Sequence, residues 1–315
     1  MKTTRIGPFR ARRSFLKAAG LTGAAVLSGG LSVAAWPKDR KRVPGIQLYM
    51  VKDALEKDPS GTLQRLRSYG YREVETAGFG NLSAGEFRKL VSDAGLTCPS
   101  AHLFFGFEES GKLLDDAKAL GAEYVVSSIL LSNPPSLLSG NFPEILKAIN
   151  ALTLDDFKKI ASLANQIGRQ AKQAGLQYVY HNHNFEFRDH NGQTGYSILL
   201  AETDPELVKF EADCGWMAAA GVDPVDYLQR YSHRIQMIHV KDFLAGTAPS
   251  TVLADPAGPK STELGRGRID CRAILAAASS AGVKHYFVEQ EPPFTEMSAL
   301  EAAKVDCAYI RSIFG

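Results

Sequence analysis

The chain has 315 residues, of which 45% are hydrophobic, and a formal net charge of +2. This composition can supply a sizeable buried core, and the absence of a basic stripe argues against a nucleic-acid partner. Its cysteines (Cys98, Cys214, Cys271 and Cys307) are widely spaced and form no Cys-x-x-Cys pair. They are too few for a disulfide framework, so we expect small buried side chains, with one disulfide conceivable in an oxidising compartment.

The N-terminal segment has the pattern of an export signal. Arg12 and Arg13 precede a mostly apolar, small-residue stretch at 18–34. Twin arginines before a modest apolar segment are typical of Tat export signals. The alternatives are a basic amphipathic helix or a membrane anchor, but glycines at 29–30 interrupt the apolar stretch, so we expect no stable membrane anchor. We therefore predict cleavage after Ala35 and a periplasmic or extracellular protein that uses the Tat machinery.

The predicted domain organisation is a signal peptide at 1–35, a charged linker at 36–42 and one domain at 43–315. Tat substrates cross the membrane folded, so a metalloprotein on this route could collect its ion before export. The sequence does not fix the oligomeric state, and a homo-oligomer is compatible with it.

Beyond the linker, strand and helix patterns alternate to the C-terminus. Predicted strands lie at 45–49, 73–75, 97–103, 123–128, 177–183, 207–213, 235–240 and 285–290. Predicted helices lie at 58–67, 83–94, 108–120, 154–174, 195–202, 223–231, 270–281 and 296–313. The strands are mostly apolar, as expected when both faces of a parallel sheet are covered. Eight such units predict an α/β fold, the (β/α)8 TIM barrel, rather than an open doubly wound sheet.

Two long loops are predicted after the fourth and seventh strands, at 132–143 and 244–268. Both would lie at the end of the barrel where catalytic loops gather. No GxGxxG motif follows the first strand, which argues against a dinucleotide site.

Polar, ligand-type side chains follow several predicted strands. His181 and His183 end the fifth strand and point to the same side of it, because side chains alternate along a strand. Asp213, His239 and Glu289 end the next three strands. The carboxyl ends of barrel strands meet at one mouth, and buried carboxylates and imidazoles are costly unless they are paired or bound to metal. The pattern therefore predicts an open metal site at the mouth.

Five motifs together resemble the xylose-isomerase-like TIM-barrel superfamily. They are 45–49 (GIQLY), 180–187 (YHNHNFEF), 211–216 (EADCGW), 238–242 (IHVKD) and 288–291 (VEQE). Members of this superfamily are usually called sugar phosphate isomerases/epimerases, and endonuclease IV is a distant relative. The resemblance covers about residues 43–315 and implies a carbohydrate substrate.

The resemblance also implies a set of metal ligands. In the epimerase branch a divalent ion (Mn, Mg, Co or Zn) is held by Glu, Asp, His and Glu on strands five to eight. Asp213, His239 and Glu289 match the last three positions, and His181 occupies the first, where many relatives have Glu. This departure leaves open whether His181, His183 or Glu186 supplies the strand-five ligand.

The implied mechanism is proton abstraction next to a carbonyl group. The ion would polarise the substrate oxygens, and Glu289 or Glu186 would remove the carbon-bound proton. Lys241 would help to stabilise the enediolate, and a histidine such as His183 could shuttle a proton.

Glu75, His102 and Trp216 would line the sugar pocket as substrate-binding residues. Isomerisation or epimerisation of a sugar or keto-sugar is the first hypothesis. The second keeps the site but makes the enzyme a lyase or hydrolase of keto-glycosides, which export and the His-for-Glu change favour. A non-catalytic periplasmic carbohydrate-binding barrel is the third. A DNA-repair nuclease like endonuclease IV is disfavoured, because it would need more histidines for a trinuclear zinc cluster and a basic groove.

Overall fold

The computed structural model describes residues 43–105, 109–131 and 142–314. The predicted signal peptide, the linker and most of the loop at 132–143 lie outside these residues. None of the helices in the described part of the chain has the length and hydropathy that a bilayer crossing requires.

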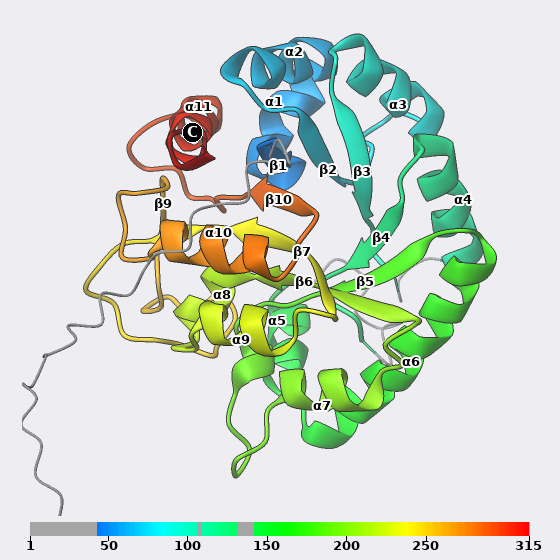
Figure 1. Ribbon diagram of the computed structural model, residues 1–315, viewed down its shortest axis with the longest axis vertical. Helices are drawn as coiled ribbons and strands as arrows, with labels where there is room; N and C mark the ends of the chain where they lie inside the picture. The colour runs from blue at the N-terminus through cyan, green and yellow to red at the C-terminus, as the bar shows by residue number, and fades with distance from the viewer. Residues whose placement is uncertain (1–42, 106–108, 132–141, 315) are drawn as a thin grey trace, which may run out of the picture. The chain divides into compact units, whose positions relative to one another are not determined.

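The described chain forms a closed barrel of parallel strands surrounded by helices (Figure 1). The barrel strands are β1 (Gly45–Gln47), β2 (Glu73–Ala77), β3 (Thr97–His102), β4 (Tyr124–Ser127), β5 (Gln177–His181), β6 (Val208–Asp213), β7 (Ile235–Val240) and β10 (His285–Val288). Their order around the barrel is β1-β10-β7-β6-β5-β4-β3-β2, so each strand pairs with its neighbours along the chain. The predicted TIM barrel is confirmed.

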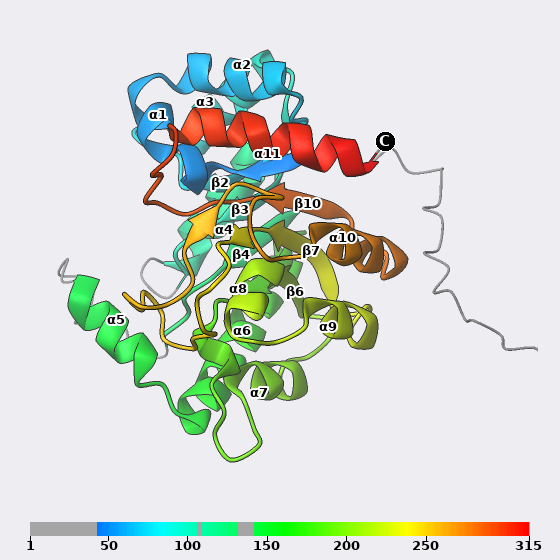
Figure 2. The same ribbon diagram turned by 90° about the vertical axis from the view of Figure 1, so that its left-hand side faces the viewer.

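The helices are α1 (Lys52–Lys57), α2 (Pro59–Tyr69), α3 (Ala84–Asp93), α4 (Ser110–Leu120), α5 (Phe142–Asn150), α6 (Leu154–Gln173), α7 (Gly195–Glu202), α8 (Cys214–Ala219), α9 (Pro224–Arg230), α10 (Cys271–Ser280) and α11 (Ala299–Phe314). A capping box begins α3: Ser83 and Glu86 each accept a hydrogen bond from the other's backbone N–H group. The last helix, α11, packs against α2, so the N-terminal and C-terminal parts of the described chain lie side by side (Figure 2).

The structure corrects several predicted boundaries. The fifth and eighth strands end two residues earlier than predicted, at His181 and Val288. Helices α1, α5 and α8 were not predicted, and the loop at 244–268 pairs through the short strands β8 (Asp242–Phe243) and β9 (Ser261–Thr262). The side chain of Asp213 accepts a hydrogen bond from the Trp216 N–H, so α8 begins directly after β6 without a separate turn signal.

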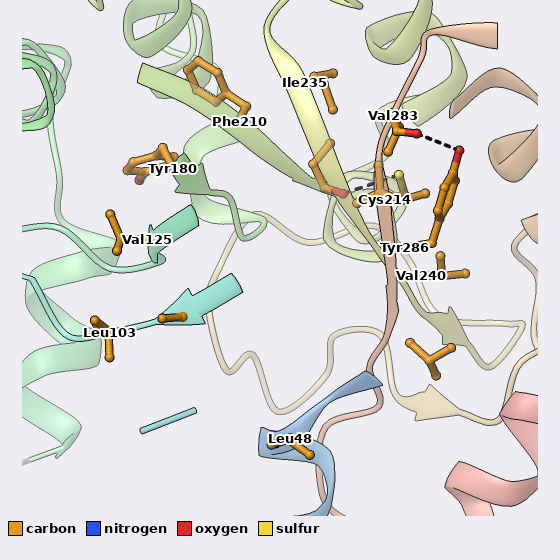
Figure 3. Close-up of a cluster of buried hydrophobic side chains, with 14 of the residues drawn as sticks. Leu48, Leu103, Val125, Tyr180, Phe210, Cys214, Ile235, Val240, Val283 and Tyr286 are labelled. Atoms are coloured by element: carbon orange, nitrogen blue, oxygen red, sulfur yellow. Dashed lines mark hydrogen bonds between the residues drawn. The ribbon is translucent and has the colours of Figure 1, made fainter. Parts of the chain in front are cut away.

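Two clusters of buried side chains pack on opposite faces of the barrel strands. Outward-facing residues such as Val125, Tyr180 and Phe210 pack among the side chains of the main buried core (Figure 3). A second buried cluster comes from two strand pairs that are separated around the barrel, β4–β5 and β7–β10, so its members meet across the barrel axis: Tyr124, Val126, Val179, Met237 and Phe287. This axial cluster fills the barrel one layer below the polar residues at the mouth.

The cysteines take no part in cross-linking. All four lie in the described part of the chain and are free; Cys214, Cys271 and Cys307 are buried, and Cys98 is partly buried. The disulfide that the sequence left conceivable is absent.

Candidate metal centre at the barrel mouth

His239 is at the middle of a buried polar cluster. Its Nδ1 lies 2.8 Å from Glu289 Oε2, and its Nε2 lies 3.0 Å from Glu75 Oε1 and 3.2 Å from Glu211 Oε2. Burial lowers the pKa of His239, but the negative charges of Glu211 and Glu289 outweigh burial and raise it well above its ordinary value. Met237 and His239 are two residues apart on β7, so their side chains point to the same face of the strand. Met237 lies in the axial cluster, and His239 lies among the carboxylates.

His181 faces His239 from β5, with 4.5 Å between the ring centroids. Its Nδ1 lies 3.0 Å from Glu211 Oε2, and its Nε2 lies 3.7 Å from Asp213 Oδ2. Burial, followed by the charge of His239, lowers the pKa of His181 well below its ordinary value. A neutral imidazole has a lone pair free to bind a metal ion.

Asp213 completes this part of the cluster. Its Oδ2 lies 3.8 Å from His239 Nδ1 and 3.0 Å from Lys241 Nζ, yet it lacks the alignment for a hydrogen bond with any described residue. Burial raises the pKa of Asp213 to about 6, against the opposing effect of Lys241. A fully buried carboxylate oxygen without a hydrogen bond is an exception that needs a physical explanation.

This donor set fits a divalent cation. His181, Asp213 and His239 each place one possible ligand atom within 4.8 Å of the others. The Glu289 carboxylate lies next to this group, with Oε2 2.8 Å from His239 Nδ1. Two imidazoles and two carboxylates are ligands that Zn²⁺, Mn²⁺ and Co²⁺ accept. Three of the four predicted ligands, His181, Asp213 and His239, therefore have the spacing of a metal site, and Asp213 Oδ2, which has no hydrogen bond to the described residues, is available as one of its ligand atoms.

Lys241 follows β7 and is nearly completely buried. Its ammonium lies 2.8 Å from Glu289 Oε2 and 2.5 Å from Glu291 Oε1. Burial lowers the pKa of Lys241, but the charges of Asp213 and Glu289 raise it well above the ordinary value, so the group is an ammonium at neutral pH. Gly215 leaves room for it, since a Cβ at that position would lie 2.4 Å from the Lys241 Cβ.

Trp216 borders the same network from α8. Its indole N–H donates to Glu291 Oε1 at 2.9 Å, and the Lys241 ammonium lies 5.2 Å from the ring centroid. The predicted substrate-binding Trp216 is therefore close to the predicted site residues. Only 9% of its surface is exposed, so little of the ring is accessible to a ligand.

Glu75 and His102, the other predicted substrate-binding residues, differ in access. Glu75 is fully buried behind His239, where Gln47 Nε2 donates to it at 2.5 Å and the Ser100 hydroxyl donates to its other oxygen. His102 Nδ1 lies 3.3 Å from Glu75 Oε1, and 15% of its side chain is exposed. His102 can thus reach a ligand in the mouth, whereas Glu75 contacts protein groups.

Glu186 is fully buried and its carboxylate is engaged by the protein. One oxygen accepts from the Tyr180 hydroxyl at 3.0 Å and the other from the His183 N–H at 2.9 Å. Burial raises the pKa of Glu186 to about 8. The short 3₁₀ turn Phe185–Phe187 ends the extended run and directs this carboxylate to the protein rather than to the metal-type cluster.

His183 is partly buried between other rings. Its centroid lies 5.2 Å from that of His181 and 5.8 Å from that of Trp216, and its Nδ1 has no hydrogen-bond partner among the described residues. Burial, followed by the charge of Lys241, lowers its pKa to about 3. His183 therefore offers a neutral imidazole near the opening.

Glu211 was given no role in the sequence analysis, although it contacts both His181 and His239. It lies two residues before Asp213 on β6, and strand alternation gives both residues the same inward face. Gln47 on β1 was also missed. The signal in each case was a polar residue in a short, otherwise apolar strand.

The fold and this cluster define a TIM barrel with a metal-type site at the carboxyl ends of its strands. Residues 63–313 match the family described as xylose isomerase-like TIM barrel, so the chain belongs to that family. The resemblance found in the sequence motifs is thereby confirmed.

The curated proteins that the chain resembles include inosose dehydratases. It is 30% identical over 198 residues to inosose dehydratase of Mesomycoplasma hyopneumoniae strain 7448, a match that spans 63% of this chain and 58% of that relative. The chain thus spans less than two thirds of the length of that relative.

Two solved structures share the fold. A sugar phosphate isomerase/epimerase from Parabacteroides distasonis has a TM-score of 0.66 and 23% identity, with 88% of this chain and 96% of that one covered. The IolI protein with a bound zinc atom has a TM-score of 0.62 and 16% identity, with 86% and 98% covered.

Proposed function

We propose that the chain is a divalent-metal-dependent lyase that eliminates a leaving group from a keto-sugar. The similarity to inosose dehydratase supports the reaction class, and the zinc atom bound to the IolI protein, which shares the fold, supports a divalent metal. The ligands would be His181, Asp213, His239 and Glu289. When bound, the ion would supply Lewis acidity toward the keto oxygen of the substrate.

One observation favours elimination over epimerisation. The resemblance implies that epimerases use opposed glutamates from strands five and eight, but β5 here presents His181 to the site. Glu186, the nearby alternative, is occupied by Tyr180 and the His183 backbone. Glu289 is therefore the one carboxylate of the two predicted bases that remains able to act on the substrate. Elimination needs a base on only one face of the substrate carbon.

The protein groups can carry such a reaction without a second base. Burial opposes ionisation of Glu289, but the charges of Lys241 and His239 lower its pKa, so it is a carboxylate at neutral pH. Glu289 would take the proton from the carbon beside the keto group, leaving the C–H electron pair as an enolate. The Lys241 ammonium would stabilise that charge.

The second half of the reaction regenerates the base. The enolate electrons form a carbon–carbon double bond as the carbon–oxygen bond at the next carbon breaks. Protonated Glu289 returns its proton to the leaving oxygen, which departs as water or as an alcohol. His102 and His183, at the opening, would hold the sugar hydroxyls.

We also propose that the substrate is not phosphorylated and that the enzyme works after export. The twin-arginine pattern at Arg12 and Arg13 supports export. An exported enzyme meets free or glycosidic sugars more readily than sugar phosphates. Keto-sugars and keto-glycosides are accordingly the substrate class to test.

Elemental analysis followed by incubation with keto-sugars and keto-glycosides in deuterated water tests the proposal. We expect bound divalent metal, release of water or alcohol, and an unsaturated ketone detected by ultraviolet absorption. Deuterium uptake into an isomer or epimer without release of the leaving group would instead establish the second candidate, which the unpartnered imidazole of His183 favours as a further base. Sugar binding without metal or turnover would contradict both and indicate a carbohydrate-binding barrel.

A further inference from the structure

The two histidines of the proposed metal site have distinct inner and outer nitrogens. His181 Nε2 and His239 Nδ1 both face Asp213 Oδ2, at 3.7 and 3.8 Å. The opposite nitrogens, His181 Nδ1 and His239 Nε2, both face Glu211 Oε2, at 3.0 and 3.2 Å. A single oxygen of Glu211 thus lies close to one nitrogen of each ring, and His239 Nε2 also contacts Glu75 Oε1, at 3.0 Å.

Strand register explains this arrangement. Glu211 on β6 is the direct partner of His181 on β5, and Asp213 is the direct partner of His239 on β7. Glu211 is fully buried, and its second oxygen, Oε1, has no hydrogen-bond partner among the described residues. Its carboxyl group therefore faces the two imidazoles.

We propose that Glu211 is a positioning residue for the metal site, an inference that rests on the metal dependence proposed above. It accepts a hydrogen bond from His181 Nδ1–H, which leaves the lone pair of His181 Nε2 for the ion, and it lies 3.2 Å from His239 Nε2, on the side of that ring away from Asp213. Carboxylates in this position fix the tautomer and orientation of a metal-binding histidine and make it a stronger ligand.

The pair His181 and Glu211 also places a carboxylate beside the strand-five position. The resemblance implies a glutamate ligand on strand five, where this chain has an imidazole. The Glu211 carboxylate lies 3.0 Å from His181 Nδ1 and belongs to the neighbouring strand. The acidic group that the resemblance implies on strand five thus lies one strand away, beside the histidine.

The rival interpretation makes Glu211 a ligand of a second ion. Glu211 belongs to two other groups with metal-type spacing, one with His102 and His181 and one with Glu75 and His239. The Glu75 oxygens, however, already accept from Gln47 and Ser100. One ion with Glu211 beside its histidine ligands leaves these hydrogen bonds to Glu75 unchanged.

Metal binding to the purified full chain separates these interpretations. We would titrate metal-free protein with Co²⁺, record its visible absorption and calorimetric affinity, and measure the metal content. The wild type should bind one ion, and Glu211→Gln should still bind one, about 10–100-fold more weakly and with shifted Co²⁺ absorption bands. Thermal unfolding of the metal-free variant verifies that it folds.

A charge-restoring variant gives a second measurement. His181→Glu combined with Glu211→Gln places the carboxylate on β5 itself, so its Co²⁺ affinity should recover to within about 10-fold of the wild type. A residue needed only for packing would not be rescued in this way. This comparison holds even if Glu211→Gln alone fails to fold.

The outcomes that overturn the inference are specific. Two ions in the wild type and one in Glu211→Gln would make Glu211 a ligand. Wild-type affinity and an unchanged Co²⁺ spectrum in Glu211→Gln would remove its positioning role while leaving the proposed function intact. A wild-type chain that binds no divalent ion would contradict the proposed function itself.

Discussion

The ammonium of Lys241 lies 2.8 Å from Glu289 Oε2, within a buried network that also includes Asp213 and Glu291. Two roles meet in this contact. The cation compensates carboxylate charge that burial would otherwise make costly, and it stands beside the group that we propose as the base.

Replacing Lys241 by Met should affect both roles. We expect kcat toward a keto-sugar to fall by about 10²–10³-fold, because a preorganised charge is lost, while bound metal is retained. The free energy of unfolding should fall by about 3 kcal/mol, because buried carboxylates lose their cation. Steady-state kinetics, metal analysis and urea unfolding measure the three quantities.

Lys52→Met is the matched control for that change. The Lys52 side chain is exposed and its ammonium lies 4.7 Å from the Tyr49 ring centroid. Its removal should change the unfolding free energy by less than about 0.5 kcal/mol and leave kcat unaltered. Equal losses in both lysine variants would contradict the proposed role of Lys241.

Removing either of two proposed ligands should release the metal. His239→Ala and Glu289→Ala lie on different strands, so their common effect would identify one ion between them. We expect both to lose bound metal and activity together, as measured by elemental analysis and turnover. Full metal content in both variants would mean that the ligands are assigned to the wrong residues.

Asp306 on α11 should make stability depend on pH. It accepts a hydrogen bond from the Leu264 N–H at 2.7 Å, and burial raises its pKa from 3.8 to about 7. The folded state then holds the proton more tightly than the unfolded state. Its stabilising contribution is complete below about pH 4 and is lost as pH rises through 7, by about 4 kcal/mol at most.

Asp306→Asn keeps an oxygen for Leu264 but does not ionise. The variant should therefore match the wild type near pH 4 and be the more stable of the two at pH 8. Unfolding free energies at the two pH values measure the difference. A variant less stable than the wild type at pH 8 would show that the ionised carboxylate is favourable in the fold.

The twin arginines give a test of location. The double substitution Arg12→Lys and Arg13→Lys should block export through the Tat machinery, because that machinery recognises the arginine pair. Fractionation of cells that express the wild type and the variant should find the variant retained in the cytoplasm. Equal amounts outside the cytoplasm would show that the segment does not act as this signal.

Much of the fold follows from hydrophobic pattern, and the site follows less completely. Eight apolar runs alternating with helices are enough for the barrel, and strand order then places Asp213, His239 and Glu289 at one end. The direction of Glu186 depended instead on a 3₁₀ turn and the Tyr180 hydroxyl, which no periodicity reports. The role of Glu211 depended on its register with His181, which becomes visible only when strands are paired.

The axial cluster beneath the metal centre has a kinetic consequence. Phe287, Met237 and Val179 block the barrel below the polar layer, while the partly exposed His102 and Glu291 lie at the upper opening. An ion and a sugar would therefore enter through the same opening, with the ion bound deeper and the sugar above it. A seated sugar should shield the ion from chelators, so metal loads first, and its escape waits for the product to leave.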